Sequence, residues 1–158
     1  WRYDIRRLGY NYRLSDIACA LAVSQLARVD WSVGRRGMLA EYYLRGLSAA
    51  EGVAPLKAVS ENAYHLFVVK LDLDRLRAGR AQVFRALHAE GIGVNVHYEP
   101  VYRHTVYQRM GYAPSGLCPD AEAACERILT LPLFPTMTLQ DADDVLEAFA
   151  KVLLAYRR

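Results

Sequence analysis

The chain is 158 residues long, a length that indicates one domain or one domain with an arm. Hydrophobic residues make up 53% of it, enough for a sizeable core and too many for a disordered chain. The net charge is only +3 and acidic residues are interspersed among the arginines, so no basic stripe supports a nucleic-acid partner. No apolar stretch is long enough to span a membrane, and we expect a soluble, cytoplasmic protein without a membrane partner.

The three cysteines, Cys19, Cys118 and Cys125, lack the spacing of metal ligands, and we predict no metal site. Cys118 and Cys125 are two helical turns apart, which is too far for a disulfide if both lie on one helix. We therefore expect buried thiols in a reducing compartment.

A glycine-led loop at residues 9–16 precedes the first helical run. Ser15 is a good N-cap for this helix, and Asp16 would meet the positive end of its dipole. Asn11 and Arg13 lie before the cap, and an amide and a guanidinium both suit a phosphate or a carboxylate. From the residues alone, an anion site and a loop that merely caps its own backbone are equally compatible with this pattern.

The remaining elements follow from periodicity, turn residues and caps. Apolar residues recur at helical spacing at 17–29 and 33–47, in one bent helix or two, and a strand rich in β-branched and aromatic residues is expected at 64–72. Then come a helix at 77–90, a strand at 92–98, helices at 102–110 and 119–129, an edge strand at 128–133, and a last helix from a capping box at Thr138 to Tyr156. This order predicts an α+β fold, a short sheet covered by helices on one face.

A second candidate site lies at the end of the predicted strand at 92–98. His97 and Tyr98 come just before a proline turn and can project into a cleft, although a lone histidine is often only structural. His65 is expected to be structural inside a buried strand, and His88 and His104 to lie on solvated helix faces. The sequence contains no glycine-rich phosphate loop and no serine nucleophile elbow.

Three segments together resemble the DegT/DnrJ/EryC1/StrS family of sugar aminotransferases, which use pyridoxal 5'-phosphate (PLP). They are residues 9–26 with Asn11 and Arg13, residues 91–102 with the His97–Tyr98 pair, and residues 124–133. The resemblance covers essentially the whole chain in order. It implies the C-terminal small domain of a fold-type I PLP aminotransferase, preceded by a long linker helix. Residues 1–50 would then join the large domain and residues 51–158 would form the small one.

By this resemblance, Asn11 would reach across a homodimer interface to the PLP phosphate of the partner subunit, with Arg13 beside it as a second cofactor-binding residue. His97, Tyr98 and Tyr102 would line the cleft for the nucleotide sugar. No residue of this chain is expected to be catalytic.

Tyr102 with the Tyr107–Gln108 pair is most similar to the pseudaminic-acid pathway members of the family. That resemblance implies amination of a UDP-linked 4-keto-6-deoxy sugar with glutamate as the donor, in polysaccharide biosynthesis.

Family members are well over twice as long as this chain, and their Schiff-base lysine lies upstream of the position of Trp1. None of Lys57, Lys70 and Lys151 lies in a matching motif, so the chain alone should be inactive without the missing large domain. Residues 17–47 should show apolar surface that the large domain would cover. The alternative is a non-catalytic binding or regulatory module that keeps the small-domain fold.

Overall fold

The computed structural model describes Tyr10, residues 12–56 and residues 62–158. The elements are α1 (Asp16–Leu26), α2 (Val29–Gly46), β1 (Val53–Pro55), β2 (Phe67–Leu71), α3 (Arg80–Ala89), the 3-10 helix η1 (Val101–Arg103), α4 (Thr105–Arg109), α5 (Pro119–Cys125), β3 (Ile128–Leu131) and α6 (Leu139–Tyr156). In the described part of the chain, no helix is both long and apolar enough to cross a membrane.

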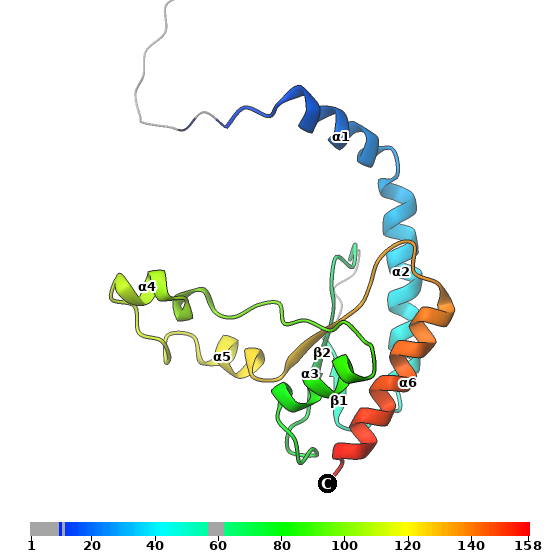
Figure 1. The fold of residues 1–158 in the computed structure, drawn as a ribbon, viewed down its shortest axis with the longest axis vertical. Helices are drawn as coiled ribbons and strands as arrows, with labels where there is room; N and C mark the ends of the chain where they lie inside the picture. The colour runs from blue at the N-terminus through cyan, green and yellow to red at the C-terminus, as the bar shows by residue number, and fades with distance from the viewer. Residues whose placement is uncertain (1–9, 11, 57–61) are drawn as a thin grey trace, which may run out of the picture.

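The molecule has three parts around a small sheet (Figure 1). Helices α2 and α6 lie side by side, and α1 continues from α2 away from the sheet. Residues 99–126, with η1, α4 and α5, project from the other side and are called the lobe below.

The sheet is antiparallel with the order β1-β2-β3. Side chains alternate along β2, so that Phe67 is buried on one face while Lys70 is exposed on the other. The Tyr43 ring of α2 packs on Phe67 with ring centroids 5.0 Å apart, which places α2 over the buried face. The predicted α+β fold, a short sheet covered by helices after a long linker helix, is confirmed.

Helix α6 is fixed by the predicted capping box. Thr138 Oγ1 accepts a hydrogen bond from the Asp141 amide at 3.1 Å, and Asp141 Oδ2 accepts one from the Thr138 amide at 2.8 Å. This backbone bond lowers the pKa of the Asp141 carboxyl. The apolar stripe of α6 then enters the core, through Ala142, Val145, Phe149, Val152 and Leu153. Each larger side chain contributes about 1.5–3 kcal/mol by burial.

The two helical runs at the N-terminus are separate helices, α1 and α2. Ser15 caps α1 as predicted, with its hydroxyl oxygen 3.3 Å from the Ala18 amide. Helix α1 buries no side chain, and large apolar residues from Leu14 to Val33 are exposed. The expected apolar surface is therefore present there. It does not extend along the rest of α2, because Leu39 and Tyr43 are fully buried in this domain's own core.

The prediction of a strand at 92–98 is wrong. Asn95 makes one isolated bridge to Thr130, with backbone hydrogen bonds of 3.1 and 2.8 Å. The Asn95 side chain accepts a hydrogen bond from the Val96 amide at 2.8 Å, a local bond that competes with a continuous ladder. The segment therefore pairs with the free edge of β3 through one residue, Asn95.

Four other points differ from the expectations. Helix α5 ends at Cys125 because Ile128–Leu131 pairs with β2, and β1 was not predicted. His65 is exposed before β2 rather than buried inside it, and Cys19 and Cys118 are exposed, so that only Cys125 is a buried thiol.

Candidate functional site

The N-terminal candidate site lies on the segment ahead of α1. The described part of this segment, Tyr10 and residues 12–15, is called the arm. Asn11 falls outside the described residues. Arg13 is exposed two residues before the Ser15 cap, and it follows Tyr10 and Tyr12, whose stacked rings have centroids 5.4 Å apart. An exposed guanidinium next to a capped helix can bind a phosphate in two-pronged geometry.

His97 is held against the sheet. Its Nδ1 atom lies 2.9 Å from the hydroxyl of Thr130, which is buried on β3. The Tyr98 ring meets the His97 ring edge-on with centroids 4.6 Å apart, and Tyr98 is 68% exposed. The sheet thus positions a histidine that presents an exposed tyrosine, an arrangement suited to stacking on or hydrogen bonding with a ligand.

Tyr102 points into the lobe. Its hydroxyl donates a 2.6 Å hydrogen bond to Glu122 Oε1, which also accepts the Gly116 amide at 2.8 Å. Burial, together with this bond, raises the pKa of Tyr102 to about 12. The same bond lowers the pKa of Glu122. The phenolic proton of Tyr102 is therefore already engaged, and a ligand at this hydroxyl would have to donate to it.

Arg103 gathers three carboxylates that sequence reasoning missed. Its guanidinium lies 3.1 Å from Glu99 Oε1, 3.5 Å from Glu122 Oε2 and 3.2 Å from Glu126 Oε1. The other Glu99 oxygen accepts a hydrogen bond from the Cys125 thiol at 3.3 Å. The spacing of four between 99 and 103 and between 122 and 126 was a visible signal, but nothing in the sequence indicates that the two pairs meet.

The electrostatics of this group agree with its geometry. The hydrogen bond from Arg103 lowers the pKa of Glu99, and the same bond raises the pKa of Arg103. Burial, and then the bond to Glu99, raises the pKa of the Cys125 thiol. Glu99, Glu122 and the Arg103 guanidinium are thus charged around neutral pH, while the Cys125 thiol is protonated.

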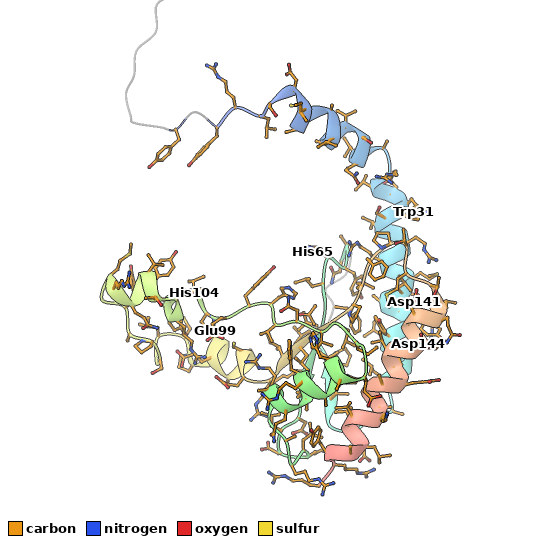
Figure 2. All side chains as sticks on the ribbon, in the orientation of Figure 1. Trp31, His65, Glu99, His104, Asp141 and Asp144 are labelled. Atoms are coloured by element: carbon orange, nitrogen blue, oxygen red, sulfur yellow. The ribbon has the colours of Figure 1, made fainter. Side chains whose placement is uncertain are left out.

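The structure brings only some of the predicted residues together. His97, Tyr98 and Tyr102 lie on one continuous segment from the sheet edge into the lobe, where Figure 2 labels the neighbouring Glu99 and His104. His104 is exposed, as expected. Arg13 lies on the arm, which Figure 1 shows apart from the lobe. The described residues of one chain therefore do not form a closed pocket from both candidate sites.

The described residues of the two candidate sites suit the phosphate group of PLP, but they include no lysine for its Schiff base. Arg13 fits the phosphate group, as argued above. Lys151 is ion-paired with Glu90 at 2.6 Å, and Lys70 lines a groove with Arg75 and Arg127. Lys57 lies outside the described residues. Of the lysines that are described, neither lies in the Arg13 or the His97 site.

Known proteins resemble this chain in sequence and in fold. The chain is 32% identical to the uncharacterized protein MJ1066 of Methanocaldococcus jannaschii over 97% of its own length, but it spans only 40% of that relative. Its structure matches Spr1654 of Streptococcus pneumoniae in the PLP form with a TM-score of 0.84 and 28% identity, over 98% of this chain and 40% of that one.

A third match is Helicobacter pylori PseC, an aminotransferase involved in the biosynthesis of pseudoaminic acid. The TM-score is 0.85, over 97% of this chain and 41% of that one, but the identity is 22%, so this match speaks for the fold alone. The sequence model of the DegT/DnrJ/EryC1/StrS aminotransferase family matches residues 1–150. The chain therefore belongs to the DegT/DnrJ/EryC1/StrS aminotransferase family.

Proposed function

We propose that this chain is the C-terminal part of a PLP-dependent sugar aminotransferase. The reaction moves the amino group of glutamate to the keto carbon of a nucleotide-linked 4-keto-6-deoxy sugar, and it yields the 4-amino sugar and 2-oxoglutarate. The observation that carries the proposal is a family match along residues 1–150 in a chain that spans about 40% of its relatives. PLP, when bound, supplies the carrier for the amino group and the sink for electrons.

The roles of this chain's residues follow from where they lie. Asn11 and Arg13 would hold the phosphate of the cofactor bound in a partner subunit. Support for this role comes from the exposed guanidinium of Arg13 on the arm. His97 and Tyr98 would line the sugar-nucleotide site, with the His97 ring steadied by Thr130 and the exposed Tyr98 ring available to the ligand. Tyr102 would border the same site, and its hydroxyl would accept a hydrogen bond.

The division of the chain also belongs to this proposal. Residues 1–50 would connect to a large domain, and residues 51–158 would form the small domain, into whose core the later part of α2 packs through Leu39 and Tyr43. The apolar residues between Leu14 and Val33 supply the argument, because a surface of this kind is usually covered in the working protein. The large domain would bring the lysine for PLP, and a homodimer would bring the arm to the partner's cofactor.

A finer assignment is to the UDP-4-amino-4,6-dideoxy-N-acetyl-altrosamine transaminase of the pseudaminic-acid pathway, with a UDP-linked substrate. Its basis is the set of Tyr102, Tyr107 and Gln108 in the lobe. Tyr107 packs edge-on against Tyr112 with centroids 6.1 Å apart, so it is a fixed part of the lobe surface.

The test compares the purified 158-residue chain with the longest natural gene product that contains it. Each is incubated with PLP, glutamate and a UDP-linked 4-keto-6-deoxy-N-acetylhexosamine, and 2-oxoglutarate is measured. We expect turnover only with the longer protein, and weaker PLP retention in its Arg13→Ala variant than in an Arg109→Ala control. Turnover by the short chain, or a longer protein inert towards every nucleotide sugar, would overturn the proposal. The second result would favour the non-catalytic module.

A further inference from the structure

We propose that Arg103 is a positioning residue for the sugar-nucleotide site: it closes the lobe through Glu99, Glu122 and Glu126 and thereby sets the orientation of the His97–Tyr98 pair. This inference rests on the proposed function for the identity of the ligand. The closure of the lobe itself rests on contacts within this chain.

The contacts of Arg103 join the two ends of the lobe. Glu99 and Arg103 stand at the beginning of the lobe, and Glu122 and Glu126 stand at its end. Arg103 bridges the two ends with distances of 3.5 Å to Glu122 and 3.2 Å to Glu126. A cross-link between residues about twenty apart restricts the loop between them, as any loop-closing contact does.

Arg103 contacts more negative charge than it can neutralise. Its one guanidinium faces three carboxylates, while the Arg80 charge on α3 also acts on Glu99. The Arg103 and Glu122 side chains are only 21% and 15% exposed, so solvent screens this pair less than it screens surface pairs. Without Arg103, three like charges would remain close together, and the bonds of Tyr102, Gly116 and the Cys125 thiol and the more distant Arg80 would have to offset them. The lobe would then open or shift to separate these charges.

Glu99 links the lobe to the His97–Tyr98 pair. Both oxygens of Glu99 are engaged, one by Arg103 at 3.1 Å and the other by the Cys125 thiol at 3.3 Å. Glu99 directly follows Tyr98, whose ring contacts the His97 ring. The backbone after Tyr98 is therefore held by Arg103, while His97 is held by Thr130 on the other side. Loss of Arg103 frees one of these two anchors.

Loss of Arg103 should affect the half-reaction with the nucleotide sugar more than the half-reaction with glutamate. A double-displacement aminotransferase reacts with glutamate and with the keto sugar in separate half-reactions. A displaced Tyr98 should impair mainly the half-reaction that needs the large nucleotide sugar, because glutamate carries no sugar or nucleotide for these residues to contact. A misplacement of about 1 Å can cost on the order of 100-fold in rate, so the effect is measurable.

The test uses Arg103→Gln, Arg103→Lys and the control Arg109→Gln, which removes an exposed arginine from α4 in the same lobe. In the longer gene product, Arg103→Gln should lower kcat/KM for the nucleotide sugar about 10- to 100-fold and leave the glutamate half-reaction within about twofold. Arg103→Lys should restore part of the loss, because it keeps the charge without the planar fork. Arg109→Gln should match the wild type in both half-reactions.

A second measurement needs no activity. Hydrogen exchange in the 158-residue chain should be faster at the lobe amides in Arg103→Gln, with α6 protection unchanged. Equal losses in both half-reactions, or unfolding of the whole domain, would reduce Arg103 to a stability role and overturn the inference. If the longer wild-type protein aminates no sugar, the proposed function fails alone, and unchanged exchange in Arg103→Gln then overturns the lobe closure.

Discussion

The Tyr102 hydroxyl donates a 2.6 Å hydrogen bond to Glu122, a residue twenty positions later in the chain. This bond joins the η1 turn to α5 and places a phenol beside a carboxylate whose pKa the bond itself lowers. A residue expected to contact the substrate is thus also part of the lobe's internal structure.

Tyr102 should therefore ionise at high pH. Its pKa is raised from 10.0 to about 12 by burial and by the bond to Glu122. Because the folded pKa is the higher one, the stabilisation is complete below pH 10 and is lost as the pH rises towards 12. We expect the difference in tyrosinate absorbance between wild type and Tyr102→Phe to show a midpoint near 12. A midpoint near 10 would contradict the hydrogen bond.

At acid pH the stability should depend on pH with the opposite sign, rising as the pH rises. The pKa values of Glu99 and Glu122 are lowered from 4.5, so their stabilisation is complete above 4.5 and is lost as the pH falls through the lower folded values. Glu122→Gln should destabilise the chain at pH 7 and flatten the fall in urea midpoint below pH 4.5. Glu147→Gln, at an exposed position of α6, is the control and should follow the wild-type curve.

The two N-caps should differ in their effect on global unfolding. Thr138→Ala removes the capping box of α6, a core helix, and should cost about 1 kcal/mol in the free energy of urea unfolding. Ser15→Ala removes an equivalent cap from α1, which buries no side chain, so it should reduce helicity in circular dichroism without moving the urea midpoint. Equal shifts of the midpoint would show that α1 is part of the cooperative unit.

Glycine-to-alanine changes in α2 should have opposite signs at two positions. A Cβ at Gly34 meets no atom within 4 Å, so Gly34→Ala should stabilise the chain by about 0.5–1 kcal/mol through helix propensity. A Cβ at Gly46 would lie 2.5 Å from Leu146 Cδ1, and Gly46→Ala should instead destabilise the α2–α6 contact. Thermal denaturation of the two variants measures the signs, and stabilisation by Gly46→Ala would mean that Leu146 moves freely.

Local signals in the sequence were sufficient for much of the fold. The Thr138 box and the Ser15 cap depend on side chains within three residues of the amides they bond, so their patterns predict them directly. The apolar stripe of α6 and the β-branched run of β2 also carry their periods in the sequence. The residues alone indicated Asn11, Arg13, His97 and Tyr98 as candidates, and the family resemblance added Tyr102 and the roles. All of these except Asn11 can be placed in the structure.

What failed was decided at long range. The segment at 92–98 has an alternating pattern, yet it pairs with β3 only at Asn95, because the neighbouring edge and a local side-chain bond compete for its backbone groups. Helix α5 ends earlier than predicted for a related reason, because Ile128–Leu131, which would have continued towards it, pairs with β2 as a strand. Local sequence patterns do not include the stabilisation that a distant partner strand provides.

The sequence by itself determined the capped starts of α1 and α6, the α+β class and the family of this chain, because caps, periodicity and motifs are properties of neighbouring residues. Only the tertiary structure decided that Arg103 meets Glu122 and Glu126, and that Tyr102 points into the lobe. These contacts join residues about twenty positions apart, and their strength depends on burial and charge that exist only once the lobe is folded.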